Sequence, residues 1–238
     1  MLAVFRTLAA WGLTATGLPW IVALHFLGRR GLIPDEVVIG VIRAWGRATL
    51  ACLGVRLSAR NPSTLEDQVA RVVVINHQSA LDVLWAAAFC APAPFAIGKK
   101  EVVWVPGLNL IWWAFDFIRI DRKNTQAAIR AMAGVAEKIR RERRTLYIAP
   151  EGTRTSTGQM LPFKKGAFHI AIQGQLPIYP VVVSGAYEAL PKSRFIGYPG
   201  EIRVKFLEPV STIGLGAGDV DALLARVRAE MEREFRSL

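Results

Sequence analysis

Residues 71–82 read RVVVINHQSALD and join a short apolar run to a polar turn. The β-branched residues at 71–75 have polar neighbours on both sides, which predicts a buried β-strand. His77 follows at the carboxyl end of that strand, and Asp82 comes five residues later. On one continuous helix, five residues rotate by about 140°, so the two side chains would diverge. They can meet if His77 lies on the turn before a helix and Asp82 lies in its first turn.

Such a pair has a defined chemistry. An ionised Asp82 accepts a hydrogen bond from the imidazole Nδ1–H, which fixes the tautomer and leaves Nε2 of His77 as a base. The alternative is a helix start at which Asp82 favours the helix dipole and His77 is incidental. The two residues alone do not separate these interpretations, so the rest of the chain has to decide.

Strand and helix patterns alternate along the rest of the chain. Further short β-branched runs lie at 145–149, 178–184 and 202–208. Helical spacing of apolar residues extends from 124 to about 144, from near 165, and from 219 to 235. This alternation predicts an α/β domain with a mixed, largely parallel sheet flanked by helices. Ligands of such sheets collect at the carboxyl ends of the strands.

Two charged motifs follow predicted strands or apolar stretches. Residues 150–154 read PEGTR, in which Gly152 lets the backbone approach a ligand and Arg154 can grip a phosphate. The alternative for this motif is a solvated turn. Residues 119–123 read RIDRK and can bind phosphate, or can precede a helix capped by Asp121 or Asn124.

Some familiar signals do not occur in the sequence. It contains no G-x-G-x-x-G, no G-x-x-x-x-G-K-[ST] and no G-x-S-x-G. Their absence argues against a dinucleotide enzyme, a P-loop nucleotidase and a lipase-like hydrolase. Residues 177–181, PIYPV, carry two prolines and by themselves indicate the start of an edge strand.

Together these motifs resemble the glycerolipid acyltransferase family, and most closely its bacterial 1-acylglycerol-3-phosphate acyltransferases. The resemblance covers about residues 70–210, with NHQSALD, FIRIDRKN, PEGTR and LPIYPVVV in the family's order. It implies the fold of a glycerol-3-phosphate acyltransferase and transfer of a fatty acyl group to the sn-2 hydroxyl of 1-acylglycerol-3-phosphate. It further implies acyl-CoA or acyl-carrier protein as the donor, a lysophospholipid acceptor, phosphatidic acid as the product, and neither a cofactor nor a metal.

The resemblance also assigns residues. His77 and Asp82 take the catalytic positions. The residues expected to bind the acceptor or its phosphate are Lys100, Arg122, Glu151, Gly152, Thr153 and Arg154. Supporting positions are Asn76, Ser79, Pro177 and Pro180. The family usually has glycine six residues before the arginine of the second motif, and here Asp116 stands there. This departure puts the identity of the lyso-acceptor in doubt more than the chemistry.

Composition indicates a membrane partner. Of 238 residues, 52% are hydrophobic and 21% are charged, and the formal net charge is +11. A basic and apolar chain fits an anionic bilayer better than nucleic acid, because no nucleic-acid-binding module is found. Cys52 and Cys90 have apolar neighbours and metal-ligand spacing is absent, which predicts two buried thiols in a reducing compartment.

The N-terminal segment is expected to attach the chain to the membrane. No charged residue occurs between Arg6 and Arg29, which is long enough to cross about 30 Å of hydrocarbon. The stretch 37–57 carries Arg43 and Arg47 on one helical face and indicates an interfacial helix. We therefore expect membrane-anchoring helices in 1–60 and the acyltransferase domain in 61–238. If the first segment spans, the basic residues that follow it predict that the domain lies on the cytoplasmic face of the cell membrane.

Several alternatives stay open. Whether residues 7–28 cross the membrane or lie in it is not decided by the sequence. The stretch 102–117 borders either an acyl groove or the bilayer, or else is a core helix. The same chemistry on a lyso-ornithine lipid or another lysophospholipid is a second enzyme hypothesis. A non-catalytic basic membrane-binding protein is the hypothesis from a different class, but it leaves the four ordered motifs unexplained.

Overall fold

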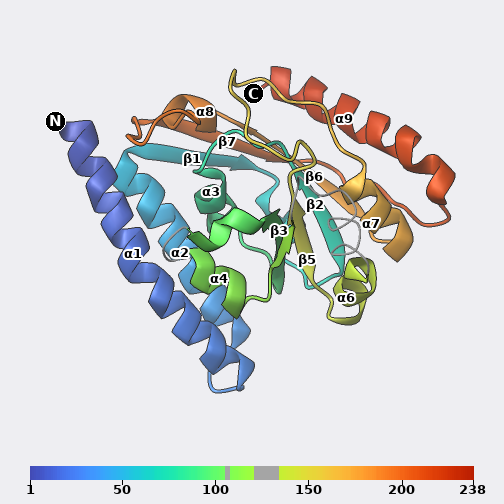
Figure 1. Ribbon diagram of the computed structural model, residues 1–238, viewed down its shortest axis with the longest axis horizontal. Coiled ribbons are helices and arrows are strands. Elements are labelled where there is room, and N and C mark those ends of the chain that lie inside the picture. The colour runs from blue at the N-terminus through green and yellow to red at the C-terminus, as the bar shows by residue number, and fades with distance from the viewer. Residues whose placement is uncertain (105–107, 121–133) are drawn as a thin grey trace.

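The computed structural model describes residues 1–104, 108–120 and 134–238 (Figure 1). Among these residues, the strands join in one seven-stranded sheet with the order β1-β7-β6-β2-β5-β3-β4. The strands are β1 (Val55–Arg60), β2 (Arg71–Ile75), β3 (Pro94–Lys99), β4 (Ile118–Ile120), β5 (Thr145–Ile148), β6 (Ile178–Ser184) and β7 (Gly200–Phe206). The stretch that decides the fold is therefore a central strand, because β2 lies between β5 and β6.

The strand directions decide where loops meet. β2 is parallel to both β5 and β6, and β3 is parallel to both β5 and β4. β7 returns antiparallel to β6, and β1 runs parallel to β7. The predicted mixed, largely parallel sheet is thus confirmed. The carboxyl ends of β2, β3, β4, β5 and β6 all lie at one edge of the sheet, which we call the carboxyl edge.

Helices cover both faces of the sheet, as Figure 1 shows. They are α3 (Asp82–Ala88), α4 (Leu108–Ala114), α6 (Val135–Arg141), α7 (Gly166–Gly174), α8 (Ala186–Ala189) and α9 (Val220–Arg236), with short 3₁₀ helices at Pro62–Leu65, Lys100–Trp104 and Ala217–Asp219. Alternate residues of β2 enter different cores, because successive strand side chains point to opposite faces. Val72 and Val74 join the core under α6, α7 and α9, whereas Val73 joins the core under α2, α3 and α8.

Two helices precede the sheet, α1 (Leu2–Arg29) and α2 (Asp35–Leu53). Within the described ranges, α1 is the helix that is long and apolar enough to cross a membrane. α2 ends at Gly54, whose φ of 78° is a left-handed conformation that glycine adopts without strain. The chain then enters β1, so residues 55–60, expected in the N-terminal segment, form an edge strand of the sheet.

The structure differs, wholly or in part, from three expectations from the sequence. Cys52 is exposed rather than buried, although Cys90 is buried as expected. β6 is an internal strand, because β7 returns beside it, and its pairing with β7 begins only at Val181, one residue beyond Pro180. In the stretch 102–117, Ala114 and Phe115 are core residues as the core-helix interpretation expects, whereas Trp113 is 69% exposed, and a border with an acyl groove or the bilayer stays a prediction.

Candidate active site

His77 and Asp82 meet at the carboxyl end of β2. The strand ends at Ile75, residues 76–81 form a turn, and α3 begins at Asp82. His77 Nδ1 lies 2.6 Å from Asp82 Oδ2, as the turn-then-helix arrangement requires. The His77 side chain is 27% exposed and that of Asp82 only 3%. The ring is therefore accessible from solvent, while its carboxylate partner is shielded.

The Asp82 carboxylate is surrounded by donors. Backbone N–H groups of Gln78 and Ser79 donate to Oδ2 over 2.8 and 3.0 Å. The indole Nε1–H of Trp85 donates to Oδ1 over 3.0 Å. These bonds hold the carboxylate toward the ring, which favours the tautomer with a proton on Nδ1 and leaves Nε2 as the basic nitrogen. Trp85 was not predicted from sequence, although its position one helical turn after Asp82 is the spacing at which two side chains share a face.

The turn itself is fixed by buried side chains. Asn76 Nδ2 donates to the Val183 carbonyl and its Oδ1 accepts from the Val183 N–H, both over 2.8 Å. Ser79 Oγ donates to the Leu190 carbonyl over 2.7 Å. Both residues therefore tie the turn to β6 and the segment after it. These contacts agree with the supporting positions expected for Asn76 and Ser79.

Glu151 clamps the turn from the other side. Its Oε1 accepts from the His77 N–H over 2.8 Å, and its Oε2 accepts from the Leu161 N–H over 2.9 Å. The His77 carbonyl in turn accepts from the Thr155 N–H over 2.9 Å. Glu151 is 4% exposed, and burial raises its pKa, opposed by the two backbone N–H groups. Both carboxylate oxygens are engaged by backbone, so the contacts of Glu151 are those of a residue that positions His77.

Cationic side chains lie near the rest of the PEGTR motif at the carboxyl edge. Gly152 has a φ of 71°, and an added Cβ would approach Lys164 Nζ to 3.2 Å. Thr153 Oγ1 accepts from Lys192 Nζ over 3.2 Å, and the Arg154 carbonyl lies 3.4 Å from the same nitrogen. Arg154 is half-buried. Lys192 was not predicted from sequence, because it lies 38 residues from Arg154 and only the fold brings it there.

The other predicted phosphate ligands follow neighbouring strands. Lys100 comes directly after β3, at the carboxyl edge. Arg122 follows β4 by two residues and lies outside the described residues. Asp116, the departure from the family pattern, has a φ of 55° and forms an ion pair with Lys138. A left-handed backbone explains why glycine suits this position, and aspartate is among the residues that tolerate it.

Pro177 and Pro180 lie away from this site. Pro177 precedes β6 and its carbonyl accepts from Val72 N–H over 3.0 Å, level with the amino end of β2. The Pro180 carbonyl accepts from Leu207 N–H over 3.0 Å. Both carbonyls thus accept from the sheet or from the residue directly after β7.

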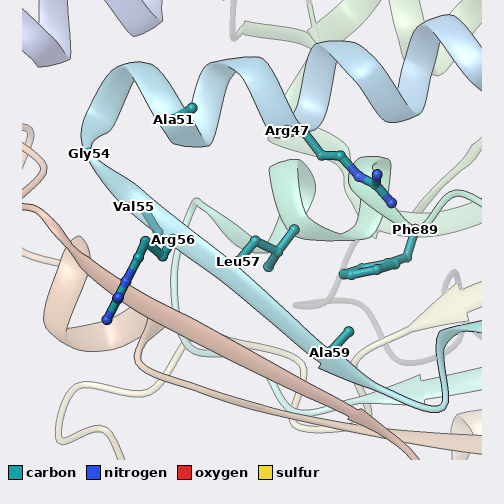
Figure 2. A pocket seen from close by; sticks show the side chains of 8 residues that line it. All are labelled: Arg47, Ala51, Gly54, Val55, Arg56, Leu57, Ala59 and Phe89. Atoms are coloured by element: carbon teal, nitrogen blue, oxygen red, sulfur yellow. The ribbon is translucent and has the colours of Figure 1, made fainter.

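A groove of about 730 Å³ opens between α2 and β1, shown in Figure 2. Arg47 descends from α2 toward Phe89, and its guanidinium carbon lies 5.7 Å from the ring centroid. The groove is lined by Arg47, Ala51, Gly54, Val55, Arg56, Leu57, Ala59 and Phe89. The groove lies beside the edge strand, and none of the site residues above is among the residues lining it. In the described part of the chain, no cluster of three or more His, Cys, Asp and Glu side chains is placed to hold a metal ion.

Comparisons with known proteins agree on one family. The acyltransferase family model matches residues 56–184, which include all four motifs. A mouse protein named 1-acyl-sn-glycerol-3-phosphate acyltransferase alpha is 40% identical over 186 residues, covering 78% of this chain and 65% of its own length. A Salmonella typhimurium protein named 1-acyl-sn-glycerol-3-phosphate acyltransferase is 33% identical over 185 residues, covering 78% and 75%.

A solved structure supports the fold. The Thermotoga maritima structure described as the 1-acyl-sn-glycerophosphate (LPA) acyltransferase PlsC superposes with a TM-score of 0.83 at 24% identity. The superposition covers 99% of this chain and 97% of that one. Both the N-terminal helices and the sheet therefore have counterparts in that fold.

Proposed function

The chain belongs to the acyltransferase family, and on that premise we propose that it transfers a fatty acyl group from an acyl thioester to the sn-2 hydroxyl of 1-acylglycerol-3-phosphate. The product would be phosphatidic acid, a precursor of phospholipids. The carrying observation is the His77–Asp82 pair, in contact over 2.6 Å at the carboxyl edge of the sheet. The printed names of the mouse and Salmonella relatives support the choice of acceptor.

In the proposed mechanism, Nε2 of His77 accepts the proton of the acceptor hydroxyl as the oxygen attacks the thioester carbonyl. A carbon–oxygen bond forms, the carbon–sulfur bond breaks, and the imidazolium returns the proton to the leaving thiolate. Base catalysis of this kind contributes about 10²–10⁴-fold, and positioning supplies more. Asp82 keeps the ring in register and stabilises its charged form. No covalent acyl-enzyme is required.

Cations near the carboxyl edge support an anionic acceptor. Arg154 and Lys100 follow β5 and β3, and Lys192 donates to Thr153, the residue before Arg154. Arg122 remains a predicted phosphate ligand. The pairing of Asp116 with Lys138 supports the same acceptor, because that carboxylate has a cationic partner on α6. Acyl-CoA and acyl-carrier protein both remain candidate donors, and we propose no cofactor or metal.

We also propose that α1 lies in one leaflet, with the catalytic domain on the cytoplasmic face of the cell membrane. Contacts at both ends of α1 support this topology. Thr7 Oγ1 accepts from the Gly197 N–H over 3.1 Å, and the His25 ring stacks on Phe115 with centroids 3.9 Å apart. A 28-residue helix is about 42 Å long. While both ends contact the domain, the helix lies along it, and its exposed face, which includes Phe5 and Trp20, is available to lipid.

The test is a product analysis. Purified protein is incubated with a mixture of 1-acylglycerol-3-phosphate, lyso-ornithine lipid and lysophosphatidylcholine, separately with acyl-CoA and acyl-carrier protein, and products are identified by mass. Phosphatidic acid is the expected product. An ester of another lysolipid in its place would contradict the proposed acceptor. Arg122→Ala should raise the KM for the acceptor with little change in kcat, and an unchanged KM would remove Arg122 from the phosphate role.

A further inference from the structure

Residues 191–199, PKSRFIGYP, connect α8 to β7 and present exposed apolar side chains that the proposed reaction does not use. Phe195 is 88% exposed, Tyr198 41% and Ile196 38%. Single exposed apolar side chains are common on protein surfaces, but three within four residues form a patch. We call residues 191–199 the 191–199 loop.

The charges of this loop are all of one sign. It contains Lys192 and Arg194 and no acidic residue. The Arg194 guanidinium carbon lies 5.5 Å from the Tyr198 ring centroid, so a cation stands directly beside the apolar patch. Aromatic and apolar side chains next to basic ones are the composition of a surface that binds the interface of an anionic bilayer.

The backbone of the loop is held while these side chains are exposed. Tyr198 N–H donates to the Ala189 carbonyl over 2.8 Å, and Arg194 N–H donates to the Pro191 carbonyl over 3.0 Å. Gly197 is buried and donates to Thr7 Oγ1. Phe195 is therefore exposed on a loop whose backbone is held by hydrogen bonds.

The bond between Gly197 and Thr7 holds the 191–199 loop against α1. The connection between α8 and β7 lies beside the amino end of α1 (Figure 1). The first turns of that helix expose Leu2, Phe5 and Leu8 by more than 60% each. Exposed apolar side chains thus occur both on the 191–199 loop and on the neighbouring end of α1, two segments about 190 residues apart in sequence.

The other end of the loop contacts the candidate active site, through the bonds from Lys192 to Thr153 and to the Arg154 carbonyl. We propose that the 191–199 loop inserts Phe195 and Ile196 into an anionic bilayer, with Arg194 at the lipid phosphates, and so holds the PEGTR motif next to the membrane that contains the acceptor. This inference rests on the proposed function. Its occupant is a lipid surface, favoured by the charge of the loop and by its position beside α1, the helix that is long and apolar enough to cross a membrane.

The test measures binding of the full chain to vesicles of equal parts phosphatidylcholine and phosphatidylglycerol. The Phe195→Ser, Ile196→Ser variant should bind at least about tenfold more weakly, because two apolar side chains lose their lipid contacts. Ile213→Ser is the matched control, since Ile213 is 80% exposed and follows the bridge of Val210 with Ile178 at the opposite edge of the sheet. It should bind like the wild type. Arg194→Ala should bind these vesicles about fivefold more weakly and leave binding to pure phosphatidylcholine unchanged.

A second measurement reports insertion directly. An environment-sensitive fluorophore attached to the thiol of a Phe195→Cys, Cys52→Ser variant should shift to the blue on vesicle addition. Equal vesicle binding by the double variant and the Ile213→Ser control, or no fluorophore shift, would overturn the inference. So would loss of a wild-type dimer in the double variant with vesicle binding unaltered, because the patch would then be a subunit interface.

The outcome is separable from that of the proposed function. Acyl transfer to an acceptor dispersed in detergent micelles should be the same for the double variant and the wild type, because neither substituted residue contacts the site. If the wild type transfers no acyl group in micelles, the proposed function fails and the vesicle measurement still decides this inference. If transfer occurs and the double variant binds vesicles normally, only this inference fails.

Discussion

Asp82 and Glu151 are buried carboxylates that follow two neighbouring strands, β2 and β5, yet their partners differ. Asp82 contacts the imidazole of His77 and collects donors from the turn and from Trp85. The two oxygens of Glu151 accept hydrogen bonds from backbone N–H groups, one of them that of His77 itself. Asp82 therefore contacts the His77 ring, whereas Glu151 contacts the His77 backbone.

This difference gives the two acidic residues different hydrogen-bonding environments within one site. From the resemblance alone, Glu151 was expected to bind the acceptor. In the structure its carboxylate links the PEGTR motif to the NHQSALD turn through the backbone N–H of His77. The comparison predicts that kcat falls most on substitution of His77, less on substitution of Glu151, and least on substitution of Trp85.

His77→Ala should cause the largest loss. Removal of the base should lower kcat by about 10²–10⁴-fold while protein stability changes little, because the ring is partly exposed. His169→Ala is the control, since His169 is an exposed histidine on α7. Near-native turnover of His77→Ala with purified donor and acceptor would show that the His77–Asp82 pair is not catalytic.

Glu151→Gln should have an intermediate effect. One of the two backbone N–H groups would face an amide NH₂ in place of an oxygen, so we expect kcat to fall about tenfold as the His77 turn loosens, corresponding to about 1.4 kcal/mol. Glu188→Gln, at an exposed position on α8, is the control. A raised acceptor KM with unchanged kcat would indicate that Glu151 binds the acceptor. It would contradict the proposed difference between Glu151 and Asp82.

The same pair of proteins tests the raised pKa of Glu151. Because the folded pKa is raised, the folded protein holds this proton more tightly than the unfolded chain does. The stability of the wild type relative to Glu151→Gln should therefore be greatest below the ordinary pKa of 4.5 and decline as pH rises through the raised value. Denaturation midpoints across this pH range check the sign. A relative stability that increased with pH would mean that the backbone bonds outweigh burial.

Trp85→Phe should have the smallest effect on turnover. It leaves Asp82 Oδ1 without the indole donor but keeps the three contacts of Oδ2. We expect kcat to fall a few-fold at constant acceptor KM, and stability to fall by about 1–3 kcal/mol. Trp20→Phe, at an exposed position on α1, is the control for thermal midpoints. If kcat were unaffected, the outer oxygen of Asp82 would be irrelevant to the alignment of His77.

Much of this site could be predicted from the sequence because it is local. The β-branched run 71–75 forms a strand wherever it is placed, and a turn followed by a helix brings residues 77 and 82 together within that one segment. β3 and β4 were not predicted, since the runs PFAIGK and IRI are short and mixed in character. Their pairing depends on neighbours distant in sequence.

The sequence by itself determined the alternation of strands and helices, the buried central strand and the His77–Asp82 pair, because side-chain periodicity and turn geometry act over a few residues. Only the tertiary structure decided which contacts cross between segments. It placed β6 inside the sheet, turned Glu151 toward the backbone of His77, brought Lys192 to Thr153, and joined the 191–199 loop to α1. Each of these contacts depends on the packing of segments that no local pattern relates.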